Sequence, residues 1–162
     1  MMDRRMMLGG GGVALAGGLA LFGGGGRSHA RPGNFEIKLS EADWKKRLTP
    51  QQYSVLRQES TERAGSSPLN KEKRKGVFVC AGCGLPLFSS ATKFESGTGW
   101  PSFWAPLKNA VGTKEDNSLF MKRTEVHCRR CGGHLGHVFD DGPKPTGLRY
   151  CMNGVAMKFR PA

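Results

Sequence analysis

The 162-residue sequence has no apolar run long enough to span a bilayer. Its longest candidate, residues 8–22, covers 15 residues, whereas a membrane-crossing helix needs about 20. Six of these 15 residues are glycines, which lower both the hydrophobicity and the helix propensity of the run. A retained membrane anchor is therefore the second interpretation of this segment rather than the first.

The first 30 residues have the three-part layout of a secretory signal: a short basic start, the weakly apolar run and a small polar end. The sequence Ser-His-Ala before residue 31 predicts cleavage after Ala30. Arg4 and Arg5 resemble the paired arginines of a twin-arginine signal. We therefore expect residues 1–30 to be a signal peptide and residues 31–162 to form one exported, periplasmic domain.

Acidic side chains are scarce, since 13 of them face 25 lysines and arginines and leave a net charge of +12. Loss of residues 1–30 would leave +10. Such a charge can favour nucleic acid, an anionic membrane surface or acidic proteins. However, the densest basic run, residues 71–75, has no interleaved aromatic side chains on which bases could stack. We interpret it as a solvated loop and expect no nucleic-acid partner.

Two short helices are expected at the start of the mature domain. Ser40 and Thr49 can each cap a helix, with Asp43 and Gln52 placed three residues later. Pro50 suits the first helical position. These features predict two small helices whose apolar faces belong to the core.

From residue 77 onward the sequence changes to short β-rich runs separated by glycine and proline, without an internal repeat beyond a doubled C-x-x-C. The expected strands are residues 77–79, 85–88, 119–126, 137–139 and 149–159. Helices followed by strands predict a mainly β (α+β) fold with antiparallel sheets.

Four of the five cysteines form two C-x-x-C pairs, Cys80 with Cys83 and Cys128 with Cys131. Four thiolates make a closed tetrahedral zinc site, which is structural because no position is left for water. A glycine directly after each pair lets the chain curl around the metal. Two disulfides or a redox C-x-x-C are the alternatives. The pattern favours one structural zinc ion that joins distant parts of the chain.

The fifth cysteine, Cys151, stands alone, and a lone cysteine is most often an inert core residue. Arg149 falls on the same side of a strand as Cys151, so its charge would favour a thiolate. Upstream, His134 and His137 could supply proton donors near neutral pH, with Asp141 close behind them. Capping within a turn is the alternative role for the histidines.

Four segments of the sequence, CAGCGLPLF, KFESGTGWPSF, CGGHLGHVFDDGP and RYCMNGVAMKF, occur in this order. They resemble the successive signature blocks of the B-type methionine sulfoxide reductases, over about residues 35–159. The resemblance implies a mainly antiparallel β fold with short N-terminal helices and a structural zinc on the paired cysteines. It also implies reduction of methionine-R-sulfoxide in peptides and proteins, the repair of oxidised proteins.

The resemblance also implies roles for individual residues. Cys151 would be the nucleophile, with Arg149 and Asn153 holding the thiolate and the sulfoxide. His134, His137 and Asp141 would orient water toward the sulfoxide oxygen. Trp100 would contact the S-methyl group of the substrate.

At one position the sequence departs from many members of that family, because Thr98 stands where they carry a second, resolving cysteine. With four cysteines committed to zinc, no thiol remains to condense with a sulfenic acid on Cys151. We therefore expect a one-cysteine cycle in which an external thiol or a thioredoxin-like reductant regenerates Cys151.

Two other hypotheses remain, a zinc-ribbon binding module without catalysis and a reductase relic with a structural or metal-binding role. Nothing in the sequence suggests more than a monomer. Loss of sulfoxide reduction in Cys151→Ser would separate the enzyme from both alternatives.

Overall fold

The structure is a computed structural model that describes residues 33–118 and 122–162. The expected signal peptide, residues 1–30, lies outside the described residues. Among the described residues, no helix has the length and apolar character that crossing a membrane requires.

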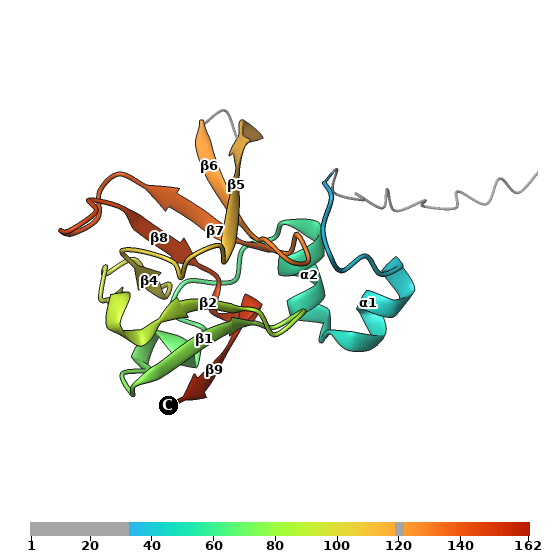
Figure 1. Ribbon diagram of the computed structural model, residues 1–162, viewed down its shortest axis with the longest axis horizontal. Coiled ribbons are helices and arrows are strands. Elements are labelled where there is room, and N and C mark those ends of the chain that lie inside the picture. The colour runs from blue at the N-terminus through green and yellow to red at the C-terminus, as the bar shows by residue number, and fades with distance from the viewer. Residues whose placement is uncertain (1–32, 119–121) are drawn as a thin grey trace, which may run out of the picture.

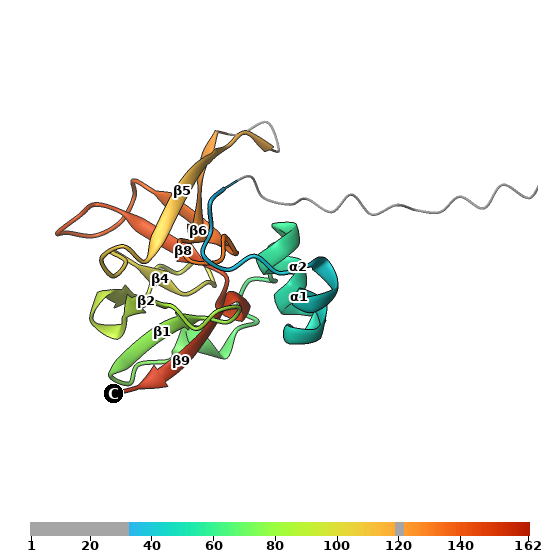
Figure 2. The ribbon, with the colours of Figure 1, turned by 45° about the vertical axis from the view of Figure 1, so that its right-hand side comes forward.

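Both expected helices are present and begin at the expected residues. Helix α1 (Glu41–Arg47) starts after Ser40, whose side chain accepts a hydrogen bond from the Asp43 N–H. Helix α2 (Pro50–Gln58) starts after Thr49, where the Thr49 and Gln52 side chains cap each other's backbone N–H groups. The two helices lie together at one end of the β-sheets (Figures 1 and 2).

The strands of the described residues form two antiparallel sheets, so the predicted fold class is confirmed. The smaller sheet has the strand order β2-β1-β9, and the larger one has the order β3-β4-β8-β7-β6-β5. The strands are β1 (Gly76–Cys80), β2 (Pro86–Ser89), β3 (Lys93–Phe94), β4 (Ser102–Phe103), β5 (Val111–Asp116), β6 (Arg123–Cys128), β7 (His134–Phe139), β8 (Arg149–Met152) and β9 (Met157–Pro161).

The strand predicted at residues 149–159 is wrong as a single element. A 3-10 turn, Gly154–Ala156, divides it into β8 and β9, which belong to different sheets. The prediction missed strands β3, β4 and β5 altogether. Residues 119–121 of the strand predicted at 119–126 lie outside the described residues, and β6 begins at Arg123.

Aromatic side chains fill the core between the sheets. The rings of Phe88 and Phe103 stack with their centroids 4.4 Å apart, and Phe78 meets Phe103 edge-on at 4.9 Å. All three side chains are fully buried. Phe103 is therefore a core residue, and only the other face of the larger sheet is left for polar groups.

Candidate functional site

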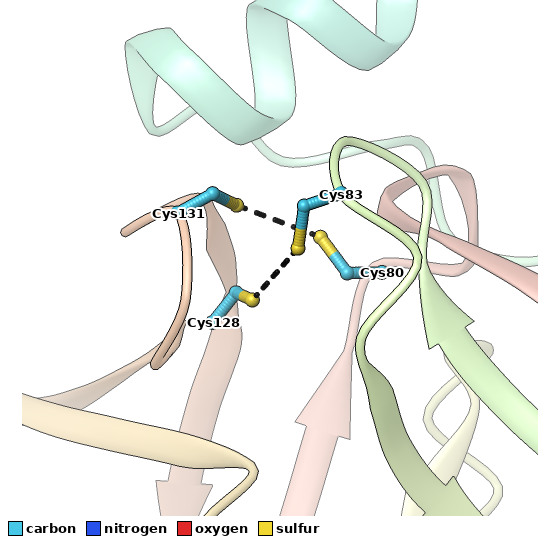
Figure 3. Close-up of side chains that lie close together, drawn as sticks. All are labelled: Cys80, Cys83, Cys128 and Cys131. Atoms are coloured by element: carbon cyan, nitrogen blue, oxygen red, sulfur yellow. Dashed lines mark hydrogen bonds between the residues drawn. The ribbon is translucent and has the colours of Figure 1, made fainter. Parts of the chain in front are cut away.

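The four paired cysteines lie together, although 44 residues separate the two pairs. Their sulfur atoms are all within 4.8 Å of one another (Figure 3). The Cys80 and Cys131 sulfurs are 3.7 Å apart, and those of Cys83 and Cys128 are 3.5 Å apart. A tetrahedral zinc ion with Zn–S bonds of about 2.3 Å needs sulfurs about 3.8 Å apart. The donor atoms therefore fit a metal of that size and preference for thiolates.

The backbone of each cysteine pair is curled as expected. Gly84 and Gly132 have φ of +75° and +66°, and their N–H groups donate to the carbonyls of Cys80 and Cys128. Cys80 is the last residue of β1 in the smaller sheet, and Cys83 lies in the turn after it. Cys128 is the last residue of β6 in the larger sheet, and Cys131 lies in the turn before β7. The four sulfurs thus connect the two sheets at one point.

Cys151 lies in the middle of β8, in a row of residues that crosses the larger sheet. Residues directly opposite each other on antiparallel strands point to the same face. The register therefore aligns one residue from each of five neighbouring strands on that face: Ser102, Cys151, His137, Glu125 and Lys114.

The Cys151 thiol is half-buried, with the Thr98 hydroxyl oxygen 3.8 Å from its sulfur. Burial raises the pKa of the thiol above its ordinary value of 9.0. The hydrogen bond from Thr98 and the positive charge of Arg149 lower the pKa, but they offset the burial only in part. The expected effect of Arg149 on the thiol pKa is therefore present, but the effect of burial is larger.

Arg149 and Asp141 form a pair of their own. The Arg149 Nε and Nη2 atoms each donate to an Asp141 carboxylate oxygen at 2.8 Å. This pairing lowers the pKa of Asp141. The guanidinium also lies over the Phe139 ring, 4.4 Å from its centroid. Asp141 is thus placed beside Arg149 and not, as the sequence suggested, beside the two histidines.

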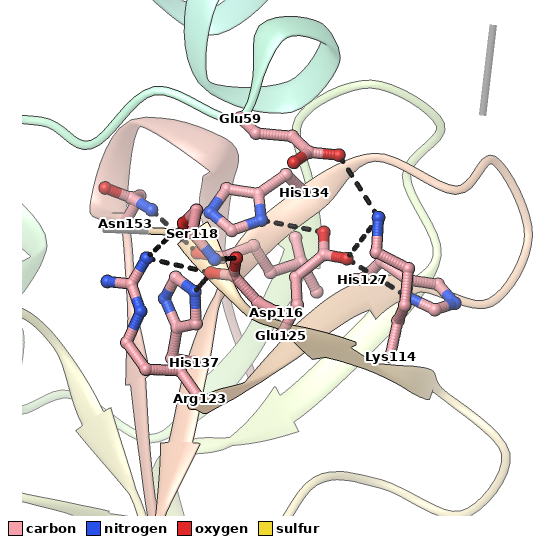
Figure 4. Close-up of polar contacts among 11 residues, drawn as sticks. Glu59, Lys114, Asp116, Ser118, Arg123, Glu125, His127, His134, His137 and Asn153 are labelled. Carbon is pink, nitrogen blue, oxygen red and sulfur yellow. Dashed lines mark hydrogen bonds and ion pairs between the residues drawn. The ribbon is translucent and has the colours of Figure 1, made fainter. Parts of the chain in front are cut away.

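The carboxylates that contact the histidines are Glu125 and Asp116 (Figure 4). The Nδ1 atom of His134 is 2.8 Å from Glu125 Oε1, and His137 Nε2 is 2.8 Å from Asp116 Oδ2. Glu125 and His134 are almost completely buried. Sequence reasoning missed both acids, although Glu125 lies three residues before Cys128, on the strand next to the one that carries the histidines.

The protonation of His137 follows from its surroundings. Burial opposes ionisation of Asp116, but hydrogen bonds from Ser118 and His137 and the charge of Arg123 outweigh it and lower the pKa of Asp116. An ionised carboxylate only accepts hydrogen bonds, so His137 Nε2 carries the proton. Burial also lowers the pKa of His137, against the opposite effect of Asp116. His137 is therefore a neutral ring whose Nδ1 can accept a proton.

One ring nitrogen of His134 has no hydrogen-bond partner among the described residues. Its Nε2 atom is buried and makes no hydrogen bond within the part of the chain that the structure describes. The His134 and His137 rings meet edge-on, with centroids 5.4 Å apart. Each ring thus has one nitrogen beside a carboxylate and one available for another group.

Trp100 and Asn153 are held by the same loop residue, Glu62. The Trp100 Nε1–H donates to the Glu62 carbonyl at 3.1 Å, and the Asn153 side-chain oxygen accepts from the Glu62 N–H at 2.9 Å. The Asn153 amide also donates to the Leu135 carbonyl at 3.0 Å. With both ends of its amide bonded to backbone, Asn153 holds the chain beside Cys151.

The chain is similar to known proteins over most of its length. The family model described as SelR domain matches residues 48–161. The chain is 58% identical over 128 residues to the peptide methionine sulfoxide reductase MsrB of Leptospira interrogans, covering 78% of this chain and 98% of that protein. It is 61% identical over 125 residues to MsrB of Methanosarcina mazei, covering 76% and 89% respectively. Against the chloroplastic peptide methionine sulfoxide reductase B1 of Arabidopsis thaliana, it is 58% identical over 121 residues, covering 74% and 60%.

Proposed function

The chain belongs to the MsrB family of peptide methionine sulfoxide reductases, and on this premise we propose that it reduces methionine-R-sulfoxide in peptides and proteins. The observation that carries the proposal is the row of Ser102, Cys151 and His137 across the sheet, which places a thiol beside a hydrogen-bonded imidazole. The R epimer and the repair of oxidised proteins are part of this proposal.

The chemistry is the transfer of one oxygen atom to sulfur. Cys151 Sγ attacks, an Sγ–O bond forms as the sulfoxide S–O bond breaks, and methionine leaves as the thioether. The thiol loses its proton to the base beside it, and the transferred oxygen gains one, so Cys151 becomes a sulfenic acid. Cysteine is oxidised by two electrons, and the sulfoxide is reduced by two.

The two histidines are suited to move the protons in this step. The available Nδ1 of His137, on the same face as Cys151, can take the thiol proton. His134 Nε2 has no hydrogen-bond partner among the described residues, and it can accept a hydrogen bond from a water molecule that donates its other hydrogen to the sulfoxide oxygen. Arg149, oriented by Asp141, stabilises the thiolate as it forms.

The return to the thiol requires an external reductant. Thr98 has a hydroxyl at the position facing Cys151 and cannot form a disulfide. Two thiols from outside, or one dithiol of a thioredoxin-like protein, would supply two electrons and two protons and release the oxygen as water. A one-cysteine cycle follows.

A zinc ion on Cys80, Cys83, Cys128 and Cys131 would be structural, since four thiolates leave no site for water. When bound, it supplies folding free energy by holding the two sheets together. None of the reacting groups named above would be a ligand of this zinc ion.

The proposal includes export through residues 1–30 by the twin-arginine route. A protein that crosses the membrane folded can load zinc before it meets oxidising conditions. Replacing Arg4 and Arg5 with lysines should then keep the protein in the cytoplasm, as cell fractionation would show. Undiminished export of that variant would contradict the route.

The decisive experiment for the proposed function is an assay with a methionine-R-sulfoxide peptide and dithiothreitol. The wild-type chain should convert the peptide to its methionine form, whereas Cys151→Ser should not. The matching S-sulfoxide peptide should remain unreacted. Activity that survived in Cys151→Ser would exclude this mechanism, and an inactive, folded wild type would favour a binding module built on the zinc site.

A further inference from the structure

Glu62 is a buried carboxylate in the loop between α2 and β1. Only 5% of the surface of Glu62 is exposed. Oxygen Oε1 accepts the Gly154 N–H at 2.6 Å, and Oε2 accepts the Val155 N–H at 2.9 Å. These N–H groups begin the 3-10 turn that follows Cys151 in the chain. The buried charge is therefore matched by two charge-assisted hydrogen bonds.

The backbone of Glu62 contacts the site as well. Its N–H donates to the Asn153 side chain, and its carbonyl accepts the indole N–H of Trp100. Every polar group of this one residue is thus bonded either to Trp100 or to residues 153–155. Trp100 is 38 positions from Glu62 in the sequence, and Gly154 is 92 positions away. No local turn therefore imposes these contacts.

The same loop holds the residue before Trp100 at a second point. The Gly99 carbonyl accepts from the Gly65 N–H at 2.7 Å and from the Asn70 side-chain amide at 2.8 Å. Gly99 has φ of +88°, and a Cβ there would lie 3.0 Å from both Ala64 Cβ and the Gly65 nitrogen. The loop and Gly99 are therefore in close contact.

We infer that Glu62 is a positioning residue, which sets the Trp100 indole relative to the Cys151 sulfur; the inference rests on the proposed function. The pairing of β4 with β8 fixes the backbone two residues after Trp100, but backbone pairing alone does not set the orientation of the indole ring. An indole has a single N–H donor, and here that donor is bonded to the Glu62 carbonyl.

The carboxylate and the carbonyl of Glu62 then act together. The carboxylate fixes Glu62 to the turn that follows β8, and the carbonyl fixes the ring to Glu62. The spacing between the ring, which would contact the substrate methyl group, and the nucleophile is thereby held. A displacement of about 1 Å in such an arrangement can lower kcat/KM by a large factor.

The variant that tests this is Glu62→Gln, which keeps the size of the side chain but replaces one acceptor oxygen with an NH₂ group that faces a backbone N–H. We expect KM for a methionine-R-sulfoxide peptide to rise about tenfold or more, with kcat within about threefold of wild type. Glu41→Gln is the matched control, because Glu41 is an exposed glutamate on α1, and it should leave both constants unchanged.

Two further measurements separate positioning from a general loss of stability. In ¹⁵N NMR spectra, the Trp100 indole N–H, assigned with Trp100→Phe, should shift and exchange faster in Glu62→Gln, while the Trp44 and Trp104 signals stay in place. Val55→Ala, which creates a cavity in α2, should lower stability without raising KM.

A double-mutant cycle tests the coupling directly. Phenylalanine at position 100 cannot donate to the Glu62 carbonyl, so Glu62→Gln should raise KM less than about threefold in the Trp100→Phe background. An equal rise in KM in both backgrounds would overturn the inference. So would a folded Glu62→Gln protein with an unchanged KM and an unchanged Trp100 signal.

If Glu62→Gln does not fold, Asn70→Ala provides the test, because Asn70 is only partly buried and the substitution removes the hydrogen bond from its side-chain amide to the Gly99 carbonyl. It should raise KM and shift the Trp100 signal, and the absence of both changes would count against the inference. An inactive wild type whose Trp100 signal still responds to Glu62→Gln would contradict the proposed function while supporting the placement of the ring by Glu62.

Discussion

The Thr98 hydroxyl oxygen lies 3.8 Å from the Cys151 sulfur, although the two residues are 53 positions apart in the chain. The hydroxyl also lies 2.9 Å from that of Ser96, which in turn lies 2.7 Å from that of Ser102. Hydroxyl groups therefore line the side of Cys151 that faces the segment before Trp100. Cys151 therefore cannot form a disulfide with residue 98, because the atom that faces its sulfur there is a hydroxyl oxygen.

Thr98→Cys should convert the cycle to an intramolecular one, because the new sulfur would lie within reach of a disulfide with Cys151. After one turnover without reductant, mass spectrometry should find a 98–151 disulfide in the variant and a trapped sulfenic acid in the wild type. Thr98→Ser is the control and should behave as wild type. An intramolecular Cys151 disulfide in the wild type would refute the one-cysteine cycle.

Arg149→Met should make Cys151 less reactive. The charge of Arg149 lowers the pKa of the thiol, so its removal should move an already raised pKa further up. At pH 8 the rate of alkylation by iodoacetamide should fall about three- to tenfold, since one pKa unit changes the thiolate fraction about tenfold. Lys158→Met, at an exposed residue of β9, is the control. An unchanged alkylation rate in Arg149→Met would show that Arg149 does not act on the thiol.

The raised pKa of the Cys151 thiol also determines how this residue changes the stability of the fold with pH. Because the folded pKa of Cys151 is raised, its contribution to stability is fully present below the ordinary value of 9.0. It is lost as the pH rises through the folded value. Cys151→Ser should therefore flatten the fall in stability at alkaline pH.

Glu125→Gln should impair both stability and catalysis, because it weakens the buried contact with His134 Nδ1. We expect a loss of about 2 kcal/mol in the free energy of unfolding and a fall of about tenfold or more in kcat. Urea unfolding and steady-state kinetics measure the two effects. Glu115→Gln, at an exposed position of β5 on the opposite face of the sheet, should change neither. Full activity in Glu125→Gln would remove Glu125 from the support of His134.

Cys131→Ser should release the metal and unfold much of the domain, because the four sulfurs connect the two sheets. The wild type should contain one zinc ion per chain by elemental analysis, and the variant none. The loss in stability should exceed about 4 kcal/mol, the range typical of removing a structural metal. Cys151→Ser is the matched control, with zinc and stability retained. An unchanged melting temperature in metal-free Cys131→Ser would show that the metal is not structural.

The elements with local signals were predictable from the sequence. Caps at Ser40 and Thr49 and the doubled C-x-x-C depend on neighbours three residues apart, so a single stretch of sequence contains the whole pattern. Cys151 could be singled out because the other four cysteines have partners.

What the sequence could not provide was the pairing between strands. Glu125 and Asp116 contact the histidines only because β5, β6 and β7 align in one register. Asp141 lies four residues beyond His137, yet the strand carries it past the histidine to Arg149 on β8. Glu62 was missed for the same reason, because its partners are distant in the sequence.

The row that runs from Ser102 to Lys114 has a consequence for how the chain can change in length. Side chains alternate between faces, so one residue inserted into β8 between Arg149 and Cys151 would turn the sulfur toward the aromatic core. In the loop before β8, residues 142–148 belong to neither a strand nor this row. Insertions and deletions should therefore accumulate in that loop, while the interior of β8 keeps a fixed number of residues even where its side chains vary.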